Sequence, residues 1–150
     1  MTAVAVLATG LALAACEAPT PSITWYGNAN SVHVGPRLYC TLTSTPQPTC
    51  SQLDGPEATL ALHTDDPVQV NIPPEVASEP WVLVYSYADD TTSYRTSVIT
   101  DGKTLSYLVR PLAGKQLKQI DLQILQVTAG ASGTPEWSPY QAWVLVVTPA

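Results

Sequence analysis

Cysteine, histidine and aspartate side chains are the groups of this 150-residue chain that could serve as nucleophiles, bases or metal ligands. The two histidines, His33 and His63, stand far apart, and no Cys-x-x-Cys or His-x-x-x-His spacing offers a metal site. No Gly-x-Ser-x-Gly motif marks a nucleophilic serine, and no glycine-rich loop is placed to cradle a phosphate. The sequence therefore predicts no catalytic residues, no metal site and no cofactor.

Two pairs of adjacent acids, Asp65-Asp66 and Asp89-Asp90, are the remaining candidates for site chemistry. Paired carboxylates can bind calcium when further oxygen ligands converge on them, but no EF-hand-like loop is present. Asp residues that follow short apolar runs are typical of turns. We expect both pairs to lie in turns, with calcium binding and acid–base chemistry as alternatives.

The first cysteine ends an apolar run that contains no charged residue from Ala3 to Ala15. This run is too short to span a bilayer, which takes about 20 helical residues, and it fits the apolar region of a secretory signal. Its last residues, Leu13-Ala14-Ala15-Cys16, resemble the lipobox of bacterial lipoproteins. That resemblance implies cleavage before Cys16 and a diacylglycerol on its thiol.

The lipobox sets the expected organisation and location of the chain. Residues 1–15 are the predicted signal peptide, residues 16–22 the lipidated N-terminus and flexible tether, and residues 23–150 a single domain. Several acyl chains, such as palmitate, anchor a protein stably, so we expect an exported protein held on the outer face of the plasma membrane. A plain secretory signal is the alternative. No Lys or Arg precedes the run, which leaves open whether Met1 is the true start.

The other two cysteines, Cys40 and Cys50, form an even pair in a chain that we expect to be exported. Such pairs are typically oxidised, and the turn-rich segment between them can bring the two thiols together. We predict a local disulfide.

The formal net charge of −6, with only six basic residues, indicates that nucleic acid is not a partner and that the lipid alone attaches the chain to the membrane.

Short apolar runs separated by turn residues predict an all-β fold, a single antiparallel β-sandwich of the immunoglobulin-like kind. The runs 81–87 and 142–147 are apolar on both faces and should be central strands. Run 117–127 fits a strand with a bulge at Leu125, or else a helix. Asp101-Gly102 predicts a hairpin between runs 94–99 and 104–109. The expected strands are residues 22–27, 31–34, 37–42, 58–63, 68–72, 81–87, 94–99, 104–109, 117–127 and 142–147.

The large aromatic residues divide into core and surface candidates. Trp81 and Trp143 belong to strongly apolar runs and should be buried. Trp137 and Tyr140 lie in the segment ASGTPEWSPYQ, which we expect to be a loop between strands. Because amphipathic rings in loops are enriched at binding surfaces, these two residues are a possible surface contact, unless the loop folds back over one end of the sandwich.

Taken together, these motifs resemble an actinobacterial lipoprotein family, Domain of Unknown Function 2771. The features that carry the resemblance are the lipobox, SITWYGNANSVHVGPRLYC, a further cysteine, DPVQVNIPPEVASEPWVLVYSY and the terminal AWVLVV. The block from Asp66 to Tyr87 is the most specific of them. The resemblance implies a cell-envelope lipoprotein with a β-sandwich domain, and it implies no activity.

The expected function is non-enzymatic: a membrane-tethered β-sandwich that acts as an interaction or assembly module for an unidentified envelope protein. The alternative is a binding or carrier protein for an apolar or glycan component of the envelope. A carrier would need a cavity between its sheets or an exposed aromatic face around Trp137.

Overall fold

Alternation of apolar and polar residues produces the first of two sheets. In the strand that begins at Val68, the valines Val68 and Val70 are buried whereas Gln69 and Asn71 are exposed, as the sequence predicts. The computed structural model describes residues 19–41, 49–53 and 57–150, so the leader and Cys16 lie outside the described residues. The first sheet has the order β2 (Asn30–Val34), β1 (Ile23–Gly27), β6 (Val68–Asn71), β9 (Ser106–Val109).

A two-residue turn joins the first two strands of this sheet. Gly27 pairs with Asn30, and the residues between them, Asn28 and Ala29, have φ angles of 48° and 57°. Two successive positive φ angles give a turn whose twist matches that of the flanking strands. The expected strands 22–27 and 31–34 are therefore joined as a hairpin.

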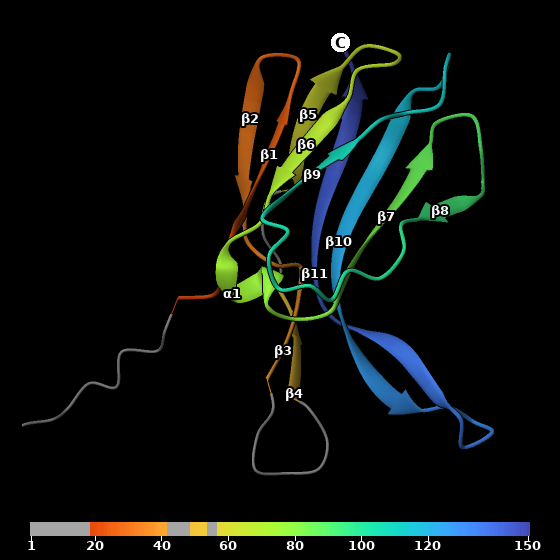
Figure 1. Ribbon diagram of the computed structural model, residues 1–150. Helices are drawn as coiled ribbons and strands as arrows, with labels where there is room; N and C mark the ends of the chain where they lie inside the picture. Colours follow the sequence, from red (N-terminus) through yellow and green to blue (C-terminus); the bar gives the residue numbers. More distant parts are fainter. Residues whose placement is uncertain (1–18, 42–48, 54–56) are drawn as a thin grey trace, which may run out of the picture.

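The second sheet contains the longest strands and faces the first (Figure 1). Its strands β7 (Trp81–Tyr87) and β11 (Pro135–Pro149) are both central, as their two apolar faces predict. The ambiguous run 117–127 belongs to the strand β10 (Leu117–Ala129). β5 (Ala58–Leu62) pairs with β11 in parallel, whereas the other pairs of this sheet are antiparallel. The order is β4 (Thr49–Gln52), β3 (Leu38–Thr41), β11 (Pro135–Pro149), β10 (Leu117–Ala129), β7 (Trp81–Tyr87), β8 (Ser93–Arg95), with β5 (Ala58–Leu62) beside β11.

The hairpin predicted around Asp101-Gly102 is wrong. The turn itself forms, because Gly102 has a φ of +64° and Asp101 Oδ1 accepts the backbone N–H groups of Lys103 and Thr104. However, β9 pairs with β6 in the first sheet, whereas β8 pairs with β7 in the second. The Asp-Gly segment thus carries the chain from one sheet to the other rather than reversing it within a sheet.

The two sheets pack through large apolar side chains, which confirms the predicted all-β antiparallel sandwich. Trp25, Trp81 and Trp143 are fully buried, so the core positions expected for Trp81 and Trp143 are confirmed. Tyr87 is also buried, and its ring contacts Tyr94 edge-on at 5.3 Å between centroids. One helical turn, α1 (Pro74–Ala77), covers one end of the sandwich and adds Val76 and Ala77 to the core.

Candidate functional site

Strands β10 and β11 continue beyond the sandwich as a two-stranded ribbon, residues 125–139, which we call the arm (Figure 1). The neighbouring strands stop at its base. β7 pairs with β10 no further than Ile124, and β3 pairs with β11 only at Gln141 and Ala142. Within the described part of the chain, no further strand flanks the arm on either side.

A β-bulge separates the arm from the sandwich. Ile124 pairs with Gln141, but the next residue, Leu125, pairs with Pro139, so Tyr140 is the additional residue. A bulge is present at the level that the sequence predicts, but the extra residue lies on the partner strand rather than at Leu125. A bulge bends the strand and increases its local twist, which accounts for the change of direction at the base of the arm.

Alternation along the arm makes it amphipathic. The cross-strand pairs Leu125–Pro139, Val127–Trp137 and Ala129–Pro135 alternate with Gln126–Ser138 and Thr128–Glu136. Because successive residues of a strand point to opposite sides, the first three pairs share one face and the last two share the other. One face is therefore apolar throughout, and Glu136 is the single charged residue of the arm.

The apolar face of the arm is open to solvent over most of its length. The side chains of Val127 and Trp137, which lie directly opposite one another, are 59% and 48% exposed. Leu125, at the base, is buried. A two-stranded ribbon is only marginally stable by itself in water, and an exposed apolar face on such a ribbon favours contact with another surface.

Among the residues that the structure describes, no strand pairs with the outer edge of β10 in the arm. The N–H of Leu125 points to this edge and donates to the carbonyl of Pro80 at 2.8 Å. Because the pattern repeats every second residue, Val127 and Ala129 point their N–H and C=O groups to the same side. The opposite edge of the arm contains Pro135 and Pro139, which have no N–H to donate.

The structure corrects the loop that the sequence predicts around Trp137 and Tyr140, since both residues lie within β11. The reversal is confined to residues 130–134, where Gly130 N–H donates to Thr134 C=O at 2.8 Å and Gly133 has a φ of +76°. Of the two aromatic residues, only Trp137 is exposed. Tyr140 packs against the core.

The described end of the tether lies at the base of the arm. Trp143 Nε1 donates to the carbonyl of Pro21 at 3.0 Å, and Pro19 and Pro21 line a groove of about 400 Å³ together with Ile124 and Tyr140. Two residues, Glu17 and Ala18, lie between Cys16 and Pro19, so the Cα atoms of Cys16 and Pro19 are at most about 11 Å apart.

The predicted disulfide is present between Cys40 and Cys50. The two cysteines lie directly opposite one another in the β3–β4 pair, with their Cα atoms 4.0 Å apart. Cys40 is buried, whereas the four residues of β4 are all exposed. The bridge therefore fastens a solvent-exposed strand to the edge of the second sheet.

The two histidines lie at separate places, and each lacks part of a catalytic set among the described residues. His33 contacts the hydroxyl groups of Ser22 and Thr24 but no acid, and Thr24 Oγ1 is 2.8 Å from its Nδ1. His63 contacts the carboxylate of Asp66 at 3.3 Å but no hydroxyl. His33 is exposed on its strand.

The acid pairs form hydrogen bonds within their own turns and with the turn around Gly114 and Lys115. Asp66 accepts the N–H of His63 at 2.8 Å, and Asp65 accepts the N–H of Gly114 at 2.6 Å. Asp89 accepts a hydrogen bond from Lys115 at 2.6 Å, which raises the pKa of that lysine. The predicted turn positions of both pairs are confirmed.

Asp90 is held in its ionised form by the turn around it. Hydrogen bonds from the backbone N–H of Thr92 and from the hydroxyl of Tyr94 lower its pKa to about 2.

Within the described ranges, no three His, Cys, Asp or Glu side chains are grouped to hold a metal ion. No helix among these residues is long and apolar enough to cross a membrane.

Comparison with known proteins places these features in a family. A family model described as "Protein of unknown function (DUF2771)" matches residues 16–148. Uncharacterized proteins of Mycobacterium bovis and Mycobacterium tuberculosis are 27% identical to the chain over 125 residues, which cover 82% of this chain and 75% of each relative. No solved structure matches the chain significantly.

Proposed function

The chain belongs to the DUF2771 family, and from its own features we propose that it is a lipid-anchored envelope protein whose arm docks onto a protein partner. The observation that carries the proposal is the amphipathic arm, with Val127 and Trp137 exposed on a ribbon that extends beyond the sandwich. The anchor keeps this surface at the membrane, and the sandwich holds it in a fixed orientation. No catalytic step is part of the proposal.

The lipid anchor is supported by the sequence before the domain. Leu13-Ala14-Ala15-Cys16 has the residue types and depth of a lipobox, and the family match begins at Cys16. Acylation of the cysteine would attach the chain through several acyl chains, each buried CH₂ contributing about 0.8 kcal/mol. The short distance from Cys16 to Pro19 would then hold the base of the arm near the bilayer surface.

A protein partner suits the arm better than the bilayer itself. The outer edge at Val127 and Ala129 presents backbone N–H and C=O groups, which are costly to bury in lipid without partners. An added strand from a partner would satisfy these groups while its side chains cover Trp137. The arm also contains Glu136 and no basic residue, so it offers no attraction to anionic lipid.

The carrier alternative gains no support from the core. Trp25, Trp81, Trp143 and Tyr87 occupy the space between the sheets, where a carrier of apolar ligands would need an open cavity. Glycan binding does not need such a cavity and is considered separately below.

The anchor is tested by intact-mass measurement of the protein extracted from its own cell envelope. We expect the mass of residues 16–150 plus a diacylglycerol, and release of the unacylated chain from the membrane in a Cys16→Ser variant. An unmodified Cys16 in the extracted protein would contradict the lipoprotein assignment.

The docking role of the arm is tested by photo-crosslinking in the same cells. A photoreactive residue at position 137 or 127 should give a discrete crosslinked protein, and the same residue at position 112 should not. Leu112 is a suitable control because it is 55% exposed and lies outside the arm. Crosslinks only to lipid, or equal yields from positions 137 and 112, would contradict the proposal.

A further inference from the structure

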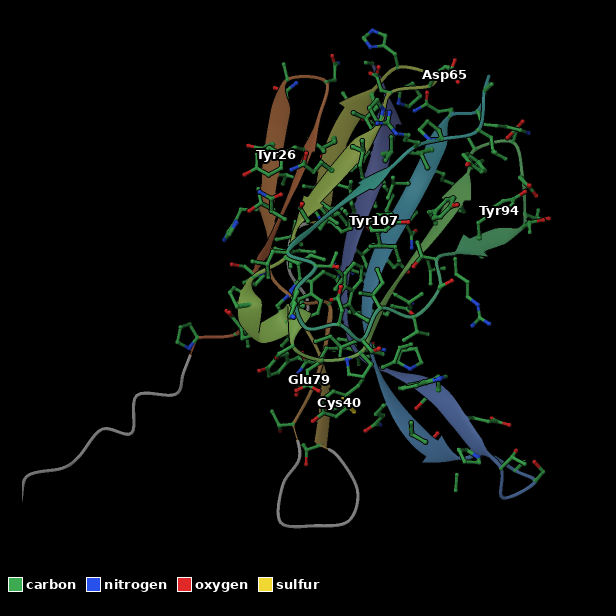
Figure 2. The ribbon with its side chains drawn as sticks, in the orientation of Figure 1. Tyr26, Cys40, Asp65, Glu79, Tyr94 and Tyr107 are labelled. Carbon is green, nitrogen blue, oxygen red and sulfur yellow. A yellow bond between two sulfur atoms is a disulfide. The ribbon has the colours of Figure 1, made fainter. Side chains whose placement is uncertain are left out.

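The side of the four-stranded sheet that faces away from the core is a second exposed surface. The arm belongs to the other sheet. Its strands bring side chains into two rows that cross β2, β1, β6 and β9. One row is His33, Thr24, Asn71, Ser106, and the other is Ser31, Tyr26, Gln69, Leu108. We call these eight residues the outer face. Figure 2 labels Tyr26 on the β1–β2 hairpin.

The outer face is polar but contains no acidic or strongly basic side chain. Its members supply amide, hydroxyl and imidazole groups, most of which can both donate and accept hydrogen bonds. This composition contrasts with a chain that has twelve acidic and six basic residues. Two exposed apolar surfaces lie within the rows: Tyr26 is 41% exposed and Leu108 is 39% exposed.

Hydrogen bonds between neighbouring side chains fix the polar groups of this face. Gln69 Nε2 donates to Asn71 Oδ1 at 2.9 Å along β6, and His33 Nδ1 lies 2.8 Å from Thr24 Oγ1 across β1 and β2. Thr24, Gln69 and Asn71 each retain further donors or acceptors, whereas both ring nitrogens of His33 are already paired, with Thr24 and Ser22. The arrangement is therefore preorganised, which lowers the entropic cost of binding a ligand.

The surface over these rows is hollowed into two adjoining grooves. The first, of about 450 Å³, is lined by Tyr26, Ser31, Gln69 and Leu108 among others. The second, of about 590 Å³, is lined by Thr24, His33, Gln69, Asn71 and Ser106 among others. Gln69 lines both, so the two grooves adjoin at its side chain and together give a shallow, open trough.

We propose that the outer face binds a neutral oligosaccharide. A sugar ring presents C–H groups on its faces and hydroxyl groups around its edge. The C–H face can stack on Tyr26 and contact Leu108, while the hydroxyl groups exchange hydrogen bonds with Gln69, Asn71 and Thr24. The absence of Asp, Glu, Lys and Arg from the eight residues matches a ligand without charge, and an open trough accommodates a chain of several sugars.

Titration calorimetry with the full-length protein in mild detergent tests this proposal. The probes are neutral hexasaccharides (cellohexaose, mannohexaose, laminarihexaose and chitohexaose) and an acidic one, hexagalacturonate. We expect at least one neutral hexasaccharide to bind, with affinity reduced at least tenfold by Tyr26→Ala or Gln69→Ala. Trp137→Ala is the matched control, because it removes an aromatic residue of similar exposure from the arm.

Three results would overturn the proposal: no binding of any neutral hexasaccharide, binding of hexagalacturonate alone, or loss of binding in Trp137→Ala with no change in Tyr26→Ala. Circular dichroism of each variant checks that the fold is retained. Since Gln69 is exposed, its replacement should leave the core intact and provides a second variant if Tyr26→Ala folds poorly. The arm can retain its proposed partner in every one of these outcomes, so the two proposals fail separately.

Discussion

Reduction of the disulfide should open one strand of the second sheet rather than unfold the protein. Cys40 and Cys50 are ten residues apart in the sequence. In the chain-entropy model, closing a loop of this size contributes about 2.7 kcal/mol at 25 °C. Converted to an equilibrium constant, this is roughly a 100-fold change.

The structure indicates where that free energy should appear. β4 is exposed at all four residues, and within the described ranges it pairs only with β3. β3 in turn pairs with β11 at just two positions, Gln141 and Ala142. Elements with few buried contacts open locally without unfolding the core. We therefore expect the bridge to govern the opening of the β3–β4 pair.

Hydrogen exchange of two backbone amides measures the effect. The N–H of Leu53 donates to the carbonyl of Arg37 at 2.9 Å beside β4, and the control is Leu122, which is fully buried in β10. After reduction, or in the Cys40→Ala/Cys50→Ala variant, exchange at Leu53 should become up to about 100-fold faster. Exchange at Leu122 should remain far slower than exchange at Leu53, because the core stays folded when the β3–β4 pair opens. No change at Leu53, or loss of protection at Leu122 down to the level of Leu53, would contradict the prediction.

Three further predictions concern individual side chains. Burial raises the pKa of Asp121 above its ordinary 3.8, so its ionised form disfavours the folded state at neutral pH. Asp121→Asn should therefore raise the Tm at pH 7, with the gain lost as the pH falls below about 4; an unchanged Tm at pH 7 would contradict this. Tyr87→Phe removes the hydroxyl that accepts the N–H of Leu112 at 3.1 Å and should lower the free energy of unfolding in urea by about 1 kcal/mol. Tyr94→Phe removes one of the hydrogen bonds that lower the pKa of Asp90 to about 2, so an NMR titration should find a partly raised pKa, and an identical titration curve would refute that assignment.

The parts of the fold that are predictable from the sequence are those in which the order of apolar and polar residues within one segment matches the burial of its side chains. Strict alternation in β6 and the two apolar faces of β7 and β11 identify their burial without any knowledge of topology. The two strands on either side of the turn at Asn28-Ala29 follow from their alternating runs, but the two-residue length of that turn does not. The disulfide follows from an even cysteine pair on either side of a turn-rich segment.

The missed features depend on contacts between distant segments. Asp101-Gly102 forms the turn that its residues favour, but whether the chain then returns to β7 or crosses to β6 is decided by tertiary pairing. Prolines at 135 and 139 suggest a loop, yet a ribbon with free edges tolerates both. The alternation Val127, Ala129 on one strand and Pro135, Trp137, Pro139 on the other reveals the arm only after their register is known.

The outer face was not predictable for a similar reason. Residues such as Thr24, Gln69 and Ser106 look like ordinary solvent-facing strand residues when each strand is read separately. Only the strand order β2-β1-β6-β9 joins them into one uncharged surface.

Recruitment of a protein partner by the arm at the membrane is tested most directly by native mass spectrometry. The protein is extracted from its own envelope in mild detergent as wild type, as Val127→Ser/Trp137→Ser and as the control Leu112→Ser. We expect a stoichiometric complex for the wild type and the control, and an uncomplexed chain for the arm variant. An uncomplexed wild-type chain, or a complex that survives the loss of both arm residues, would contradict it.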